Sequence, residues 1–388
     1  MMVSGLPGSN NVAVVPGGGN RCSRFLAPFA NASLARSVGV QKFFSSGLFS
    51  YGKIDQALLQ NASAVVLHWI AGGFLAPRQL RALDQPVFWR LSDIWPFSGG
   101  CHFPGVCTRY ETACGACPAL GRHGKRDLSH WEWRAKQRAY RGLDLTVVAP
   151  SRWIAGCARR SSLLRDRRIV YIPSGVDIHR FRPMGKEHAR AALGLPADRK
   201  IVLFGAMHLT KDSRKGYRYL QMALEYLAGR PESRNWHLAL FGGPRQPTGG
   251  DEGMSDFPVS WMGLLHDEAS LAMLYSAADV LVAPFLEDNL PNVVLEAAAC
   301  GLPVVAFDAG GLPDIVVHEQ TGWLAPVGDG EALADGIVWV LADEDRRRKL
   351  AVAAREKIEM TFAMEHCARK WKELIAGSPT LDSEKSPY

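Results

Sequence analysis

Two acidic residues, Asp288 and Glu296, are separated by seven residues. The turn residues Asn289, Leu290 and Pro291 predict that a helix begins between them, because proline is favoured at the first helical position. Asp288 then lies in the loop before the helix, and Glu296 lies on its second turn. The free N–H groups of a first turn suit a phosphate, and carboxylates suit sugar hydroxyls and a ribose diol. The segment therefore indicates a site for a nucleotide-sugar.

Glu296 is the strongest single candidate in this segment. Its neighbours Val293, Val294, Leu295 and Ala297 are apolar, so its side chain is expected to face the interior. A buried carboxylate needs hydrogen-bond partners. The two hydroxyls of a ribose would supply them.

Lys215 opens a second candidate segment. It follows the predicted strand 200–204 and precedes the predicted helix 217–228. A lysine beside a helix N-terminus is suited to hold a diphosphate, and the adjacent Arg214 is expected to assist it. The alternative is an exposed charged turn.

Further candidates follow predicted strands, because ligands of open α/β sheets bind beyond the carboxyl ends of the strands. Asp93 would orient an acceptor hydroxyl or accept its proton, unless it only caps a loop. His68 is a catalytic candidate whose alternative role is to close a hydrogen bond at a strand end. Gly242 and Gly243 would let the backbone approach the nucleotide.

Four cysteines, Cys101, Cys107, Cys114 and Cys117, occur within seventeen residues as C-x5-C-x6-C-x2-C. Four thiolates suit a closed tetrahedral zinc site, and the last pair has the spacing of a zinc knuckle. His102 is a spare ligand in this interpretation. The alternatives are free thiols or redox-labile pairs, and stable disulfides are not expected in a cytosolic chain.

Apolar, β-branched runs alternate with helical patterns, which predicts an α/β protein with doubly wound parallel sheets. The predicted strands are 64–68, 86–91, 145–149, 168–172, 200–204, 236–241, 259–262, 279–283 and 303–307. The predicted helices are 217–228, 268–277, 292–299, 330–342 and 344–362. Turn residues between Ser174 and Pro183 place a boundary between two such series.

We therefore expect an N-terminal domain over residues 1–175, with a cysteine-rich insert at 101–117, and a C-terminal domain over residues 176–362. Residues 363–388 are expected to form a helix end and a disordered tail.

The composition fits a globular protein of two domains. The chain has 388 residues, of which 47% are hydrophobic and 21% charged. It contains no run of 18 or more apolar residues, so no membrane-spanning helix is expected. The N-terminus lacks the pattern of a signal peptide, so a cytoplasmic location is expected.

The net charge of +7 is concentrated in two stretches of the chain. These stretches contain Lys125, Arg126, Arg134, Lys136, Arg138, Arg141, Arg152, Arg159, Arg160, Arg165, Arg167 and Arg168. They form either a solvated face or a surface for anionic lipid or a phosphorylated acceptor. Nucleic acid is not expected as a partner, since no DNA- or RNA-binding motif is present.

Taken together and in order, these motifs resemble the retaining glycosyltransferases of family 4, including bacterial enzymes that build exopolysaccharide or lipopolysaccharide. The segment from Asp288 to Glu296 resembles their E-x7-E signature. The other matching segments are His68-Trp-Ile, Trp89 to Cys101, Ala149-Pro-Ser-Arg-Trp153, Ile172-Pro-Ser-Gly-Val-Asp177, Arg214-Lys-Gly216 and Ala309-Gly-Gly-Leu-Pro-Asp314.

The chain departs from the pattern of that family at several places. Asp288 replaces a glutamate, and Ser92 stands where relatives often carry a histidine. Gly205-Ala206 stands where the family has a Gly-Arg pair. The missing positive charge could come from Arg214, Lys211 or His208, and we expect Arg214 to supply it. Residues 1–50 show no convincing strand, Gly-rich loop and helix, so the N-terminal domain is expected to be shortened or its start misassigned.

The resemblance implies a GT-B fold, in which two Rossmann-like domains face each other across a cleft. It implies transfer of a sugar, with retention of configuration, from a nucleotide-sugar bound by the C-terminal domain to a polysaccharide or lipid-linked saccharide. No cofactor is implied for catalysis, and peripheral contact with the inner face of the cell membrane is expected. The alternatives are a nucleotide-sugar epimerase and an inactive sugar-nucleotide-binding subunit.

Overall fold

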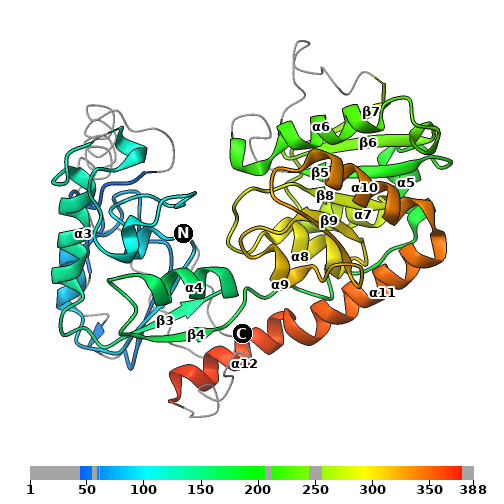
Figure 1. Cartoon of the computed structure of the whole chain (residues 1–388). Coiled ribbons are helices and arrows are strands. Elements are labelled where there is room, and N and C mark those ends of the chain that lie inside the picture. Colours follow the sequence, from blue (N-terminus) through cyan, green and yellow to red (C-terminus); the bar gives the residue numbers. More distant parts are fainter. Residues whose placement is uncertain are drawn as a thin grey trace. The chain divides into compact units, whose positions relative to one another are not determined.

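The computed structural model describes residues 44–54, 59–60, 62–121, 123–205, 212–243 and 256–377. Two compact units make up the chain (Figure 1). The first contains residues 1–172 and 371–388, and the second contains residues 173–370. The expectations for residues 1–43, for His208 and Lys211, and for the tail after Gly377 lie outside the described residues.

The first unit contains a parallel sheet of four strands in the order β1-β2-β3-β4. The strands are β1 (Val65–Leu67), β2 (Val87–Arg90), β3 (Leu145–Ala149) and β4 (Arg168–Tyr171). Helices α3 (Leu128–Ala139) and α4 (Arg152–Arg160) precede β3 and β4. Short 3-10 helices cover Pro77–Ala82, Trp95–Phe97, Arg109–Glu111 and Pro118–Leu120.

Helix α12 (Met364–Ile375) ends against this sheet. Its residues Trp371, Leu374 and Ile375 pack on Phe88 and Val148, which β2 and β3 contribute. The red helix in Figure 1 accordingly lies beside β3 and β4.

The two helices α3 and α4 of the first unit each begin at a residue whose side chain caps the helix N-terminus. The carboxylate of Asp127 accepts a hydrogen bond from the His130 N–H at the start of α3, and the hydroxyl of Ser151 accepts one from Ile154 at the start of α4. Each cap satisfies one of the otherwise unpaired N–H groups of a first turn.

The second unit contains a parallel sheet of six strands in the order β10-β9-β8-β5-β6-β7. Its strands are β5 (Lys200–Gly205), β6 (Trp236–Phe241), β7 (Val259–Gly263), β8 (Val280–Ala283), β9 (Val304–Phe307) and β10 (Gly322–Ala325). Its helices are α5 (Lys186–Leu193), α6 (Tyr217–Leu227), α7 (Glu268–Ala277), α8 (Asn292–Ala299), α9 (Leu312–Ile315), α10 (Gly330–Ala342) and α11 (Glu344–Thr361). Two 3-10 helices cover Ser213–Lys215 and Pro231–Ser233.

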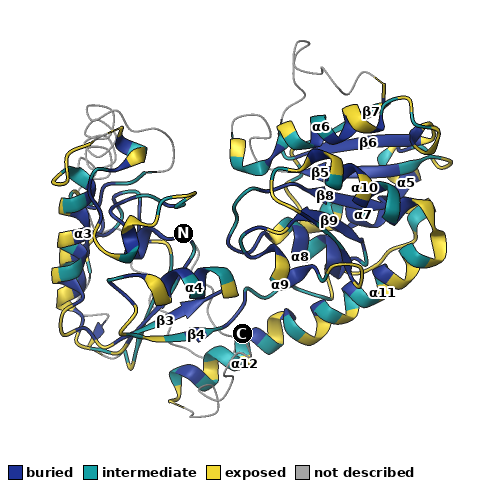
Figure 2. Ribbon diagram, in the orientation of Figure 1, coloured by how far each residue is buried: buried dark blue, intermediate teal, exposed yellow. Residues whose placement is uncertain are grey.

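The strands of this sheet are buried because helices cover both faces. All residues of β6, β8 and β9 are buried, whereas α11 alternates between buried and exposed residues (Figure 2). Such continuous apolar strands are typical of parallel sheets, as the sequence predicted.

A buried carboxylate, Asp279, anchors the start of β8. Its oxygens accept bonds from Lys186 at 2.7 Å, Arg190 at 2.7 Å, Arg347 at 2.6 Å and the N–H of Ile201 at 2.6 Å. Burial alone would raise the pKa of Asp279, but Lys186 and Arg347 hold it below its usual value. Removing one partner of such a buried network costs about 3–5 kcal/mol.

Two parallel α/β sheets confirm the predicted fold class, and all nine predicted strands are present. Strand β10 and helices α3, α4, α5 and α9 were not predicted. Helix α3 is rich in charged residues that obscure its apolar face. The first unit ends at Ile172, near the predicted boundary, and α12 returns the chain to it.

No helix in the described part of the chain is both long enough and apolar enough to cross a membrane.

Candidate functional site

Lys215 and Asp288 meet at the carboxyl edge of the six-stranded sheet. Lys215 Nζ lies 2.6 Å from Asp288 Oδ2 and 4.5 Å from the centre of the Phe285 ring. Strand β5 pairs with β6 on one side and with β8 on the other. Lys215 follows β5 and Asp288 follows β8, so the contact lies where the strand order reverses. Such a switch point is the usual ligand position in an open α/β sheet.

Two glycines allow the backbone to fold tightly around this contact. Gly216 has φ of +69°, and a Cβ there would lie 1.7 Å from the carbonyl oxygen of Pro284. A Cβ on Gly310 would lie 2.1 Å from the carbonyl oxygen of Asp288, which also accepts a 2.9 Å hydrogen bond from the Gly311 N–H. The loop that carries Asp288 is therefore held by backbone from two other segments.

Helix α8 follows this loop and carries Glu296 on its second turn. Pro291 precedes the helix as its N-cap residue rather than occupying the first helical position, and no side chain caps this end. Asn289, Leu290 and Pro291 are all buried. The loop thus leads directly from the Lys215–Asp288 pair into the first turn of α8.

Glu296 is largely buried, and Tyr275 of α7 donates a 2.8 Å hydrogen bond to its Oε2. Burial raises the pKa of Glu296 to about 7, although the Tyr275 hydroxyl acts in the opposite direction. The carboxylate thus has a hydrogen-bond partner within the protein that the sequence did not predict. Tyr275 lies in a predicted helix, and no local motif distinguishes it.

The remaining predicted donor-side residues are also near strand ends. Arg214 binds Asp212 through Nε at 3.1 Å and Nη2 at 2.7 Å, so its charge is already balanced within its own turn. Gly242 and Gly243 follow β6, and Gly242 has φ of +95°. The Gly242 N–H donates to the Gly263 carbonyl at 2.9 Å.

In the first unit, Asp93 is buried at the carboxyl edge of its sheet. Its Oδ2 lies 2.7 Å from His102 Nδ1 and accepts a 3.0 Å bond from Trp69 Nε1, while its Oδ1 accepts from the Trp95 N–H at 2.8 Å. His102 Nε2 lies 2.8 Å from the Ser45 hydroxyl. Because the carboxylate accepts, His102 carries its proton on Nδ1.

Two sequence expectations change here. His102 is not a spare metal ligand, because both of its ring nitrogens already have partners. It supplies an imidazole to Asp93 from the loop after the strand, whereas Ser92 occupies the position where a histidine was expected next to the aspartate. The sequence shows His102 nine residues after Asp93, but only the tertiary structure shows that the two side chains are in contact.

His68 follows β1 and is half-buried. Its pKa is lowered by burial and by the nearby charge of Arg90, so the imidazole is neutral at pH 7. A neutral ring can accept a proton or a hydrogen bond from a hydroxyl.

The four cysteines of the predicted metal site, Cys101, Cys107, Cys114 and Cys117, line one small cavity of about 20 Å³. None of them is in a disulfide. As the side chains stand, no three His, Cys, Asp or Glu residues in the described part of the chain are close enough to hold one metal ion.

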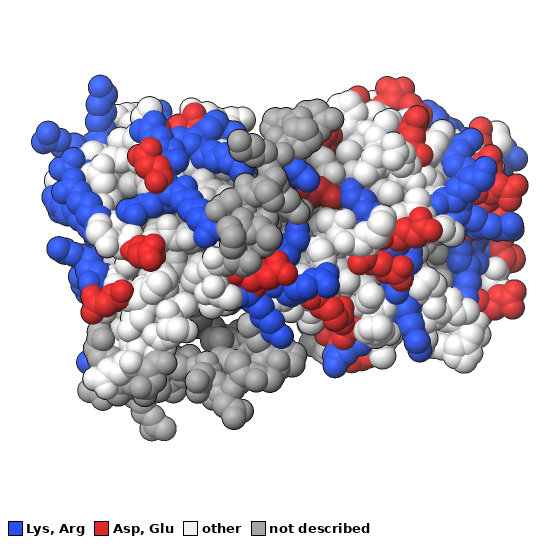
Figure 3. Space-filling model, turned by 90° about the horizontal axis from the view of Figure 1, so that it is seen from below, with Lys and Arg blue, Asp and Glu red and all other residues white. Residues whose placement is uncertain are grey.

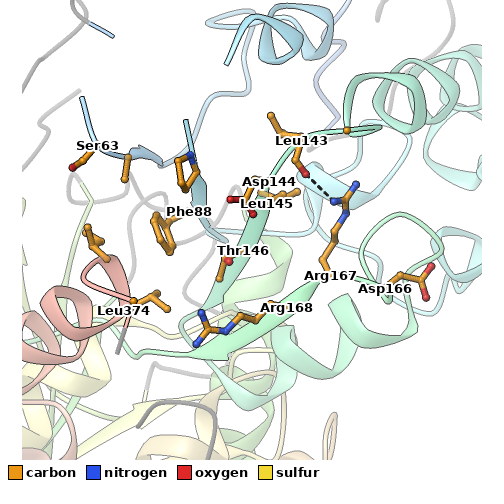
Figure 4. A pocket seen from close by; sticks show the side chains of 15 residues that line it. Ser63, Phe88, Leu143, Asp144, Leu145, Thr146, Asp166, Arg167, Arg168 and Leu374 are labelled. Carbon is orange, nitrogen blue, oxygen red and sulfur yellow. Dashed lines mark hydrogen bonds between the residues drawn. The ribbon is translucent and has the colours of Figure 1, made fainter. Parts of the chain in front are cut away.

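A much larger cavity, of about 620 Å³, lies at the amino-end edge of the four-stranded sheet, opposite the edge that carries Asp93. Asp144 and Leu145 at the start of β3, Arg168 at the start of β4 and Leu374 of α12 line it (Figure 4). Arg167 points away from the cavity centre and donates a 2.8 Å bond to the Leu143 carbonyl. Since this cavity is at the amino ends of the strands, it is separate from Asp93 and His68.

Most of the predicted basic residues of the first unit are exposed, and Figure 3 shows Lys and Arg side chains gathered over its part of one face. Lys136 contradicts the prediction. It is fully buried, lies 3.7 Å from the centre of the Trp95 ring, and donates to the carbonyls of Trp95 and Ser98. Lys136 therefore supports the loop after Asp93 and contributes nothing to a charged surface.

Three kinds of comparison relate the chain to known proteins. Residues 198–343 match the family model described as glycosyl transferases group 1. A D-inositol 3-phosphate glycosyltransferase of Corynebacterium efficiens is 30% identical over 318 residues, which cover 78% of this chain and 71% of that protein. A similar enzyme of Corynebacterium urealyticum is 30% identical over 229 residues, or 56% of this chain and 53% of the relative.

Among solved structures, a sucrose-phosphate synthase from Thermosynechococcus elongatus has a TM-score of 0.62 and 27% identity. The match covers 83% of this chain and 77% of that one. Several of the curated relatives are matched over only about half of their own length. The family model includes Lys215, Asp288 and Glu296 and lies within the second unit.

Proposed function

The chain belongs to the group 1 glycosyltransferases, which have the GT-B fold, and from this we propose that it transfers a sugar from a nucleotide-sugar to a hydroxyl acceptor. The contact between Lys215 and Asp288 at the switch point of the second sheet carries the proposal. It brings a cation and a carboxylate together beside the start of α8, as a sugar diphosphate requires.

Positively charged groups and N–H groups would bind the diphosphate of the donor, and carboxylates would bind its hydroxyls. Lys215 and the N–H groups that open α8 contact the diphosphate, and Arg214 adds charge if it exchanges Asp212 for phosphate. Asp288, released from Lys215, binds hydroxyls of the transferred sugar. Glu296 accepts hydrogen bonds from the ribose diol, while Gly242 and Gly243 allow close approach of the nucleotide. The diphosphate leaves with its charge stabilised by these donors.

On the acceptor side, we assign Asp93, His102 and His68 to binding and orienting the acceptor hydroxyl. The Asp93–His102 contact provides a hydrogen-bonded imidazole that can assist proton transfer. We propose that the reaction retains configuration, with the departing phosphate accepting the proton of the attacking hydroxyl. No metal ion is needed in this scheme.

The acceptor that we favour is a saccharide, either in a polysaccharide or linked to lipid, made at the inner face of a membrane. The exposed arginines of the first unit would attract anionic lipid, at about 1 kcal/mol for each residue near the surface. A second class, a phosphorylated polyol or sugar, is favoured by the names of two relatives, a D-inositol 3-phosphate glycosyltransferase and a sucrose-phosphate synthase. These names describe transferases and synthases, which favours transfer over epimerisation.

The experiment is incubation of the full chain with a panel of labelled nucleotide-sugars. One arm has no acceptor, one has inositol 3-phosphate or a hexose phosphate, and one has a membrane extract. Label in a phosphorylated product identifies the soluble class, and label in lipid identifies the membrane class. Epimerised donor in the first arm, or binding without turnover in every arm, would overturn the proposal.

Two variants test the donor and the acceptor assignments separately. Glu296→Ala should lose donor binding, which calorimetry measures directly, whereas Asp93→Asn should keep donor binding and lose transfer. Circular dichroism checks that each variant is folded. An Asp93→Asn protein with full transfer would remove that residue from the acceptor side.

A further inference from the structure

The four cysteines between Cys101 and Cys117 have no role in the proposed transfer, yet the fold brings them to one place. They come from the segment between the 3-10 helix Trp95–Phe97 and α3. In this segment the backbone of Cys101 forms an isolated antiparallel β-bridge with Phe44. All four line the same cavity of about 20 Å³. A cavity of this volume has room for one atom-sized occupant and no more.

Contacts within the protein fix the backbone around the sulfur atoms. In the turn Cys114-Gly-Ala-Cys117, Gly115 has φ of +150° and Ala116 has φ of +47°. A Cβ on Gly115 would lie 2.2 Å from the Lys125 carbonyl oxygen. Ala116 donates to the Gly124 carbonyl at 2.9 Å, and the Gly115 carbonyl accepts from Arg109 at 2.9 Å. The turn is therefore held from three sides, and both of its cysteines are kept on the cavity.

An amide group also points at one of the sulfur atoms, because the Gly99 N–H donates to Cys114 Sγ at 3.1 Å. Hydrogen bonds of this kind orient thiolate ligands and offset their negative charge. Asp127 fixes the same turn from behind, because it accepts the Cys117 N–H at 2.7 Å and also caps α3.

We propose that Cys101, Cys107, Cys114 and Cys117 bind one zinc-type divalent ion as a closed structural site. Tetrahedral coordination with Zn–S bonds of about 2.3 Å places the sulfur atoms about 3.8 Å apart. The side chains have to rotate toward the cavity to reach that spacing, since the described residues hold no ready set of three ligands as they stand. Four thiols on one atom-sized cavity suit this ion better than they suit two disulfides, which would leave the cavity empty.

The ion would also fix the position of His102 indirectly, through its neighbour Cys101. Residue 102 follows the ligand Cys101 directly, and its ring contacts Asp93 and Ser45. Since both ring nitrogens are occupied, His102 is positioned by the metal loop without being a ligand. The metal site itself does not depend on the proposed transfer activity.

The test is metal analysis of the full chain, purified without added metal and passed through a column after treatment with a weak chelator. We expect about one zinc per chain. The double variant Cys114→Ser/Cys117→Ser should lose the ion, and the matched control Cys157→Ser, a buried cysteine of the same unit, should retain it. Zinc that persists in the double variant would place the ion elsewhere and refute the proposal.

A second measurement covers the case in which the double variant does not fold. Wild-type protein is titrated with a mercurial reagent while released zinc is followed with a coloured chelator. Release of one zinc as four thiols react supports the site. Metal-free protein with freely reactive thiols, a disulfide among the four cysteines in mass spectra, or iron in place of zinc would each overturn it.

Discussion

Replacing Glu296 with glutamine separates the cost of this carboxylate to the fold from its use in binding. Burial raises the pKa of Glu296 from its ordinary 4.5 to about 7. A difference of about 2.5 in pKa, at about 1.4 kcal/mol for each factor of ten, corresponds to about 3 kcal/mol. The native state therefore carries this cost whenever Glu296 is ionised.

The sign of the pH dependence follows from the raised pKa. The folded protein binds this proton more tightly than the unfolded chain does, so the contribution of Glu296 to the free energy of unfolding is most favourable below about pH 4.5. This contribution falls as the pH rises, and the full cost is present above about pH 7. Glutamine is uncharged and can still accept from the Tyr275 hydroxyl, so Glu296→Gln should be more stable than the wild type by up to about 3 kcal/mol at pH 8.

Thermal denaturation at pH 8 and at pH 4 measures this difference. At pH 8 the second unit should gain roughly 6–12 °C in Tm, since 1 kcal/mol corresponds to about 2–4 °C in a unit of this size, and at pH 4 the gain should nearly vanish. Glu356→Gln is the control, because Glu356 is exposed on α11. Equal stability of Glu296→Gln and wild type at pH 8, or a gain that does not change with pH, would refute the reasoning.

The same variant should weaken nucleotide-sugar binding, because it loses a charge-assisted hydrogen bond worth about 1.5–3 kcal/mol. A more stable protein with a weaker site would show that the carboxylate is kept for binding. A variant with unchanged donor affinity would exclude Glu296 from the site.

Other residues give further expectations. Lys215→Met should weaken donor binding roughly 10- to 150-fold, the loss of one charged contact, whereas Lys349→Met serves as the lysine control because Lys349 is exposed on α11; calorimetry showing equal affinities would contradict the assignment. Gly216→Ala should destabilise the second unit by more than about 3 kcal/mol in urea, because its Cβ would lie 1.7 Å from the Pro284 carbonyl oxygen and φ is positive; a loss below about 1 kcal/mol would contradict this. Asp279→Asn should cost about 3–5 kcal/mol at pH 7, and the gap should narrow as acid protonates the wild-type carboxyl; a gap that is equal at pH 7 and pH 3 would contradict it.

Much of the second unit was predictable from the sequence. Its apolar strands and the helices α7, α8 and α10 have the predicted bounds or differ by a residue, because strand burial and helix capping leave local patterns. The order of Lys215, Asp288 and Glu296 along the chain also indicated donor chemistry. The proximity of Lys215 to Asp288, 73 residues apart, followed from the rule that parallel strands end at one edge.

The first unit was less predictable. Charged residues obscured helix α3, and Lys136 looked like surface charge although its ammonium group is buried against Trp95. The interior position of a lysine depends on carbonyl groups from a distant loop, and local sequence does not record them.

The amino-acid sequence alone determined the α/β class, the positions of most strands along the chain and the set of side chains proposed to bind a sugar diphosphate, because these depend on periodicity and on neighbours along the chain. Only the tertiary structure decided that Tyr275 binds Glu296 and that His102 reaches Asp93. These contacts join residues through the packing of loops and helices on a sheet, where the energy of a hydrogen bond depends on burial and distance and not on separation in sequence.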